Sequence, residues 1–149
     1  MQSITLPEGF RHTFPMQVRW SDMDALGHVN NARFLTYIED ARLNYINTLG
    51  LRDHRPDRPG LIIAKIVIDF RQPLFTHDQV TIFSRCARLG KSSFDMEQWI
   101  TRRRDDELQI VAQATATVVV YDYIASKSAP IPDDWRTLVK TYEVAAPSE

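Results

Sequence analysis

The chain has 149 residues, 44% of them hydrophobic and 25% charged. This composition provides enough apolar residues for one globular core and excludes an intrinsically disordered chain. Its formal net charge of −1 excludes a global positive field that would recruit nucleic acid or an anionic membrane surface. We therefore expect a single domain over residues 1–149, with no nucleic-acid partner and no membrane insertion.

Two further features bear on the compartment. Cys86 is the single cysteine, so an internal disulfide framework is impossible, and we interpret this residue as a small buried hydrophobe. Residues 1–10 contain no basic-then-apolar run of the signal-peptide type. The longest apolar run, residues 118–121, is far shorter than the ~20 residues of a membrane helix. These observations favour a cytoplasmic protein.

The first predicted elements are a strand, a loop and a long helix. Residues 16–20 alternate apolar and polar side chains, which predicts a short strand, and the Asp-, Gly- and Asn-rich residues 21–31 predict a loop. A helix is predicted over residues 32–49, where Asn30 or Asn31 can cap the start and Gly50 the end. Its apolar stripe recurs at three- and four-residue steps and consists of Phe34, Ile38, Ala41, Tyr45 and Leu49.

Four strands and a short helix are predicted for the rest of the chain. A charged, proline-rich loop over residues 51–60 precedes the strands, and the short helix covers residues 133–142. The strands are predicted over residues 61–70, 79–89, 92–102 and 108–123. Consecutive strands pair antiparallel, so we expect an α+β fold in which the long helix lies on an antiparallel sheet. A free sheet edge would favour a symmetric homodimer.

The loop before the long helix is the strongest candidate for chemistry. The free amides and dipole at a helix N-terminus attract negative charge, including charge that develops during a reaction. Asp22 or Asp24 could attack a carbonyl or activate water there, while a helix amide stabilises the oxyanion. Gly27 would let the backbone turn or approach a ligand closely. From the residues alone, an Asp before a helix can equally be a cap or turn residue.

Several other interpretations of this loop fail. A calcium loop starting at Asp22 would place Leu26 and Arg33 where an acid or amide and a Glu are needed. Aspartyl-phosphate enzymes alternate strands with helices, whereas four consecutive strands are predicted here. The G-x-S-x-G, P-loop and G-x-G-x-x-G motifs are absent, and His28 has no second His or Cys at zinc spacing. We predict neither a metal nor a cofactor.

Residues 20–34, which read WSDMDALGHVNNARF, resemble the signature of hot-dog-fold acyl-CoA thioesterases in the 4-hydroxybenzoyl-CoA thioesterase superfamily. Residues 37–42 resemble the helix of that family, and the similarity covers roughly residues 14–123. The resemblance implies a hot-dog fold, in which a curved antiparallel β-sheet wraps around one long central α-helix. It also implies active sites at a homodimer interface, and such dimers often pair again into homotetramers.

The resemblance also implies roles for individual residues. The catalytic carboxylate of the family corresponds to Asp24, and its oxyanion contact corresponds to the backbone amide of Asn31. The expected substrate-binding residues are Gly27, His28, Val29, Asn30, Phe34 and Tyr37. The expected coenzyme A contacts are Arg88, Lys91, Ser92 and Ser93. The turn that carries them is less basic than in other members, because Gly90 and Ser92 stand where a charge can occur.

These residues would hydrolyse a thioester without a metal or a redox cofactor. Asp24 would either attack the carbonyl, which gives a mixed anhydride, or act as general base for water. Two other functions stay open: an acyl-thioester dehydratase or hydratase that uses His28, and a non-catalytic acyl-thioester binding module. The acyl group, and whether its carrier is coenzyme A or acyl carrier protein, also stay open.

Overall fold

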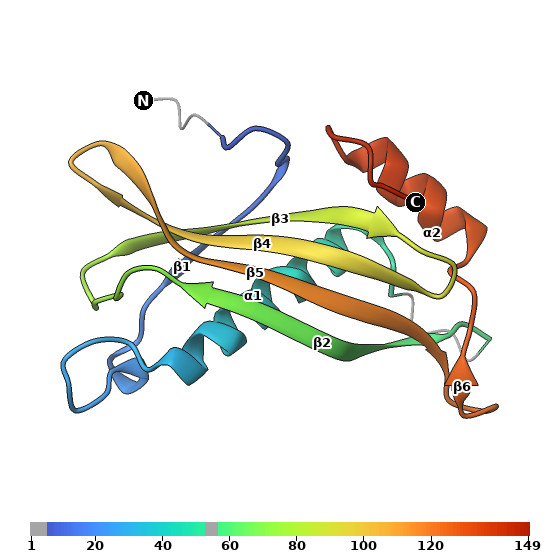
Figure 1. Cartoon of the computed structure of the whole chain (residues 1–149), viewed down its shortest axis with the longest axis horizontal. Helices are drawn as coiled ribbons and strands as arrows, with labels where there is room; N and C mark the ends of the chain where they lie inside the picture. The colour runs from blue at the N-terminus through green and yellow to red at the C-terminus, as the bar shows by residue number, and fades with distance from the viewer. Residues whose placement is uncertain (1–5, 53–56) are drawn as a thin grey trace.

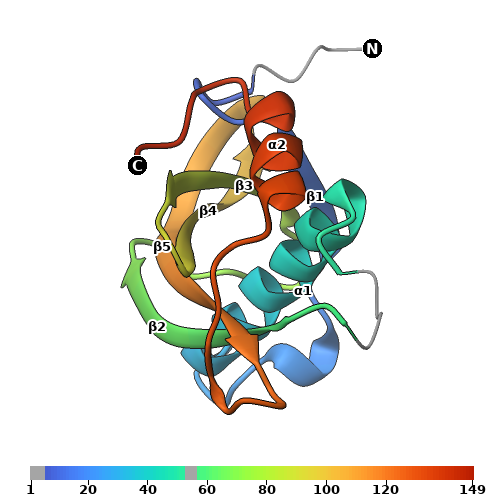
Figure 2. The same cartoon turned by 90° about the vertical axis from the view of Figure 1, so that its right-hand side faces the viewer.

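The computed structural model describes residues 6–52 and 57–149, so residues 1–5 of the N-terminal stretch and residues 53–56 of the predicted loop lie outside the described residues. Helix α1 (Asn31–Leu49) runs along one face of an antiparallel sheet (Figure 1). The sheet bends around this helix, as the view along the long axis shows (Figure 2). The predicted α+β arrangement, with one long helix inside a curved sheet, is confirmed.

The sheet has the strand order β1-β3-β4-β5-β2, and every pairing in it is antiparallel. The strands are β1 (His12–Gln17), β2 (Gly60–Phe70), β3 (Gln79–Leu89), β4 (Ser93–Arg104) and β5 (Glu107–Asp122). A short β6 (Lys127–Ser128) pairs with the end of β5, and α2 (Asp133–Tyr142) follows it. The four later strands and both helices therefore lie within a few residues of their predicted positions.

Helix α1 begins and ends where its capping residues predict. The Asn30 side chain accepts a hydrogen bond from the amide of Ala32 at 2.9 Å, and Gly50 adopts a left-handed φ of 73° after the last turn. The predicted apolar stripe is buried against the sheet. Ile38 and Ala41 share a core cluster with Ala112 and Ala114 of β5, whose small side chains let the helix and the sheet approach closely.

The first strand differs from its prediction. It covers His12–Gln17 rather than residues 16–20, because its partner β3 begins at Gln79, opposite Gln17. Beyond that point the chain turns into a 3-10 helix, Trp20–Asp22, in which the Asp22 carboxylate accepts a hydrogen bond from the Arg19 amide at 3.0 Å. The alternating pattern that predicted a strand therefore runs into a turn that a side chain holds.

Strand β2 lies at the edge of the sheet. It pairs with β5 on one side, and within residues 6–52 and 57–149 no strand pairs with its other side. Three large apolar side chains on it are exposed, Ile63, Val67 and Phe70. An apolar edge of this kind is a template for pairing with a further strand.

Across the described residues, no helix has the length and apolarity that crossing a membrane would require.

Candidate active site

The loop between η1 (Trp20–Asp22) and α1 folds back on itself in a tight turn. The amide of Asp24 donates to the His28 carbonyl at 2.9 Å, and the amide of Gly27 donates to the Asp24 carbonyl at 3.1 Å. Gly27 has a φ of +86°, a backbone conformation that residues with a side chain rarely adopt. This geometry explains the glycine in the motif and fixes the backbone on both sides of Asp24.

The same loop is anchored to the body of the protein at its second half. The amide of Val29 donates to the Leu74 carbonyl at 2.8 Å, and the amide of Asn30 donates to the Asp22 carbonyl at 3.0 Å. The side chain of Val29 is fully buried in the core cluster around α1. The start of α1 is therefore held in place relative to both acids of the loop.

The two acids occupy different environments. The Asp22 side chain is 1% exposed and accepts hydrogen bonds from the Tyr37 hydroxyl at 2.6 Å and from the Arg19 amide. Burial alone would raise the pKa of Asp22, but these hydrogen bonds and the nearby guanidinium groups of Arg19 and Arg33 hold it below its ordinary value. Asp22 is thus a buried anchor of the turn.

Asp24 remains accessible. Its side chain is 24% exposed; its Oδ1 accepts a hydrogen bond from the Leu26 amide at 2.8 Å, and its Oδ2 lies 3.7 Å from Nδ1 of His28. One carboxylate oxygen is therefore held by the loop, while the other lies beside the His28 ring. Of the two acids, Asp24 is the one that a substrate can reach.

The first turn of α1 presents one free amide. The Asn30 side chain accepts from the amide of Ala32, and the Asn30 carbonyl accepts from the amide of Arg33. The amide of Asn31, the first residue of the helix, has no acceptor among the described residues. An unsatisfied amide at a helix N-terminus is suited to bind an oxyanion.

A shallow depression of about 220 Å³ lies beside this amide. It is lined by His28, Val29, Asn31, Phe70, Arg71, Gln72 and Pro73, which come from the loop, the start of α1 and the end of β2. His28 joins it to Asp24, which is adjacent to the His28 ring. Asp24 itself does not line the depression.

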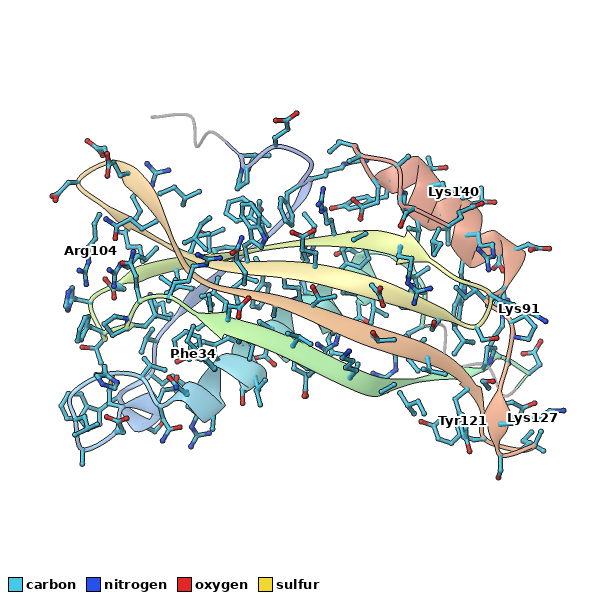
Figure 3. The ribbon with its side chains drawn as sticks, viewed as in Figure 1. Phe34, Lys91, Arg104, Tyr121, Lys127 and Lys140 are labelled. Carbon is cyan, nitrogen blue, oxygen red and sulfur yellow. The ribbon has the colours of Figure 1, made fainter. Side chains whose placement is uncertain are left out.

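Two residues expected to bind substrate lie deeper. Phe34 is buried and packs edge-on against Phe70, with ring centroids 5.3 Å apart; its place at the start of α1 is labelled in Figure 3. Tyr37 is buried too, and burial, together with its hydrogen bond to Asp22, raises the pKa of its hydroxyl. In the isolated chain both side chains belong to the core cluster that also contains Val29, and neither lines the depression.

The residues expected to contact coenzyme A surround the turn between β3 and β4. The Arg88 guanidinium donates to both oxygens of Asp95, at 2.8 and 3.1 Å, and to Oγ of Ser93 at 3.0 Å. Arg88 lowers the pKa of the Asp95 carboxyl, as expected for a bidentate pair. Lys91 is exposed, and its ammonium group has no polar partner among the described residues. Ser92 follows it, directly before the start of β4. Arg88 is thus engaged in the sheet, while Lys91 is available.

The sequence did not predict that the C-terminal helix and the residues just before it hold this turn. The Arg136 guanidinium donates to the carbonyls of Gly90 and Lys91, and the amide of Ile131 donates to the Lys91 carbonyl at 2.9 Å. Both contacts join residues that are far apart in the sequence, so no local pattern could reveal them. They fix the backbone from which the Lys91 side chain projects.

The loop and the turn lie at opposite ends of the long axis of the molecule. Phe34, at the start of α1, is at one end of Figure 3, and Lys91 is at the other. One copy of the chain therefore does not bring Asp24 and Lys91 together. Within residues 6–52 and 57–149, no group of three or more His, Cys, Asp or Glu side chains is placed to hold a metal ion.

Comparison with known proteins places this geometry in a family. Residues 18–139 match the model of the thioesterase-like superfamily, which is most of the chain. The chain belongs to the thioesterase-like superfamily. It is 30% identical over 122 residues to the long-chain acyl-CoA thioesterase FadM of Escherichia coli strain K12, which covers 81% of this chain and 91% of FadM. The predicted family and the class of thioester hydrolases are confirmed.

Solved structures agree with this assignment. A thioesterase from Thermus thermophilus, in complex with coenzyme A and Zn, has a TM-score of 0.77 and 30% identity, and the match covers 91% of this chain and 96% of that one. A 4-hydroxybenzoyl-CoA thioesterase mutant with bound 4-hydroxybenzoyl-CoA has a TM-score of 0.78 at 21% identity, with 85% of this chain and 96% of that one covered. The second likeness concerns the fold alone, which is the predicted hot-dog fold.

Proposed function

We propose that this thioesterase-like protein hydrolyses acyl-CoA thioesters and that Asp24 is its catalytic carboxylate. The observation that carries the proposal is the accessible Asp24 carboxylate beside a helix start whose first amide, that of Asn31, is free. FadM is a long-chain acyl-CoA thioesterase, and the Thermus protein was solved with coenzyme A. Both support coenzyme A as the carrier of the acyl group.

The proposed reaction uses the two groups in sequence. The thioester carbonyl lies in the depression and accepts a hydrogen bond from the Asn31 amide, which stabilises the negative charge of the tetrahedral intermediate. Asp24 either attacks the carbonyl carbon to give a mixed anhydride, which water then hydrolyses, or removes a proton from the attacking water. The thiolate of coenzyme A is a good leaving group, so the site needs no strong acid.

The minimal active unit in this proposal is a homodimer. In a single chain the loop before α1, which carries Asp24, and the turn that carries Lys91 lie at opposite ends (Figure 1), and in this proposal one acyl-CoA molecule contacts both. If the free edge of β2 pairs antiparallel with β2 of a second copy, the end of the strand in one subunit lies beside its start in the other. That arrangement brings the turn of one subunit towards the loop of the other. The pairing of two dimers into a tetramer rests on the resemblance alone.

Within such a dimer, Lys91 is our first candidate for a phosphate contact. Its ammonium group is exposed on a turn that Arg136 and Ile131 hold. Ser92 and Ser93 can donate hydroxyl hydrogen bonds beside it. Arg88 would contribute a phosphate contact only by exchanging part of its hydrogen bonding with Asp95.

The test is thiol release over a panel of acyl-CoA thioesters that includes benzoyl, short and long chains, with acyl-acyl carrier protein as a parallel arm. We expect multiple-turnover release from at least one acyl-CoA. Robust hydration of crotonyl-CoA would instead assign a hydratase that uses His28. Tight binding with no release across the panel would assign a binding module. Single-turnover hydrolysis in heavy-oxygen water separates the two routes, because only nucleophilic attack labels the Asp24 carboxylate.

A further inference from the structure

A second pocket, of about 300 Å³, lies between the C-terminal half of α1 and the start of β2. Its walls are mostly aliphatic and include Leu43, Ile46, Leu51, Leu61, Ile63 and Val118. Three charged side chains also line it, Glu39, Arg42 and Arg52. We call it the Arg42 pocket. None of the residues that line the depression beside Asn31 lines this pocket, so the two are separate cavities in one chain.

Arg42 is the unusual residue of this pocket. It is 4% exposed, and its Nη1 is fully buried without a hydrogen-bond partner. Among the described residues, no carboxylate lies within ion-pair distance of Arg42. Burial lowers the pKa of its guanidinium, an effect that Glu39, one turn earlier on α1, opposes. A buried guanidinium nitrogen without a hydrogen-bond partner is costly, because arginine stays protonated in proteins. The arrangement therefore lacks an acceptor.

The charges around the pocket indicate which acceptor fits. Two arginines and one glutamate line it, which leaves one positive charge for a ligand to neutralise. The planar fork of a guanidinium matches a carboxylate, which can accept two parallel hydrogen bonds from it. The aliphatic walls favour an apolar body behind that carboxylate. A volume of 300 Å³ holds about ten non-hydrogen atoms, if each takes the ~30 Å³ that a water molecule occupies.

We propose that the Arg42 pocket binds a carboxylate carried on a short apolar chain or ring, with the Arg42 guanidinium as its recognition element. Two sources share this chemistry. One is a free carboxylic acid, the product class of thioester hydrolysis. The other, which rests on the proposed function, is a carboxylate at the far end of the acyl group of the substrate.

The proposed dimer gives the second source a route. A two-fold axis through the middle of β2 would place Leu61 and Ile63, at the start of one strand, close to the end of the other copy's strand. Phe70 at that end lines the catalytic depression. An acyl group bound at one subunit's Asn31 amide could therefore extend towards the Arg42 pocket of the other subunit.

Binding of octanoate is the direct test, and it needs no turnover. Isothermal titration compares octanoate with octanamide, its neutral analogue of equal size, on the wild-type protein, Arg42→Met and Arg103→Met. Arg103 lies near the β4–β5 hairpin, away from the pocket, and serves as the control. We expect octanamide to bind about tenfold more weakly than octanoate, and Arg42→Met, but not Arg103→Met, to bind octanoate about tenfold more weakly. Equal binding of octanoate by wild type and Arg42→Met would overturn the proposal.

Arg42→Met should fold, because a flexible apolar side chain replaces a buried charge of similar length. Should it not fold, two measurements still decide. On the wild-type protein, the association constant of octanoate must exceed that of octanamide. Arg42→Lys must bind octanoate more weakly, because an ammonium group lacks the two parallel donors of the guanidinium fork. Equal association constants of octanoate and octanamide, or full binding by Arg42→Lys, would contradict the proposal.

Turnover separates the two sources. We compare kcat/KM for octanoyl-CoA and for an acyl-CoA of equal chain length with a terminal carboxylate, in wild type and in Arg42→Met. A preference for the carboxylated acyl group that Arg42→Met abolishes assigns the pocket to the substrate. Octanoate binding without that preference assigns it to the free acid. Both outcomes keep the carboxylate site, and failure of the thioesterase proposal would leave the octanoate titration intact.

Discussion

The hydroxyl of Tyr37 donates a hydrogen bond to Oδ2 of Asp22 at 2.6 Å, and both side chains are buried. This contact joins the second turn of α1 to the 3-10 helix that precedes the loop carrying Asp24. The Asp22 carbonyl also accepts from the amide of Asn30, the N-cap of the helix. Through its side chain and its carbonyl, the buried Asp22 therefore fixes the stretch that carries Asp24 to helix α1.

Removing that contact should destabilise the fold. Tyr37→Phe leaves the Asp22 carboxylate with one fewer hydrogen bond in a buried site, so we expect a loss of about 2 kcal/mol in the free energy of unfolding. Urea unfolding measures it. Tyr121→Phe is the matched control, because the Tyr121 hydroxyl has no hydrogen-bond partner among the described residues. Equal stability of Tyr37→Phe and wild type would show that the contact does not anchor the turn.

The same pair predicts a pH dependence of stability. The pKa of Asp22 is lower in the folded state than its ordinary value, so its contribution is present above the unfolded pKa of about 3.9 and is lost as the pH falls through the folded pKa. Tyr37→Phe removes one bond that lowers this pKa, so its stability should fall less than that of wild type in this range. Unfolding at pH 6, 4 and 3 measures the difference. Parallel losses in both proteins would contradict the assignment.

Lys91 should affect substrate binding more than the chemical step. Lys91→Met removes the proposed phosphate contact, so KM for acyl-CoA should rise several-fold and become less sensitive to salt, while kcat changes little. Steady-state thiol release at two ionic strengths measures both constants. Lys127→Met is the control, because Lys127 lies on β6 and is likewise exposed. An unchanged KM in Lys91→Met would remove this residue from the proposed coenzyme A site.

The free edge of β2 should be the dimer interface. Val67, near the middle of β2, is 51% exposed in the single chain. Val67→Lys would put a charge on the apolar edge surface that pairing of the two β2 strands covers, so we expect dissociation and loss of turnover. Sedimentation velocity measures the mass of the species. Val144→Lys, at an exposed position outside the sheet, should stay dimeric. Dissociation without loss of turnover would show that one subunit suffices.

Local patterns predicted most of the fold, and the roles of the site residues stay predictions. The stripe of α1 and its caps Asn30 and Gly50 are local signals, and the structure places the helix within one residue of its prediction. The sequence did not predict three features: the residue at which the pairing of β1 with β3 ends, the hydrogen bond from Arg136 to the β3–β4 turn, and the ion pair between Arg88 and Asp95. Each of these depends on residues that meet only after folding, so no single segment contains the information.

Arg42 illustrates the same limit. It lies on the helix next to Ala41, in a sequence that also matches the family pattern, and periodicity alone marks such a charged residue as solvent-facing. The structure buries it beside β2, a strand that begins well after the helix ends. The lack of a hydrogen-bond partner for Arg42 becomes visible only in the folded structure, where the cavity around it is known.

The turnover of Asp24→Asn on the best acyl-CoA tests the proposed function most directly. The Asn side chain can still accept the hydrogen bond from the Leu26 amide, so the loop should keep its shape, and urea unfolding should match wild type. We predict a fall in kcat of about 100-fold or more, because the substitution removes the nucleophile or base. Near-native turnover by a folded Asp24→Asn protein would contradict the assignment of Asp24 as the catalytic carboxylate.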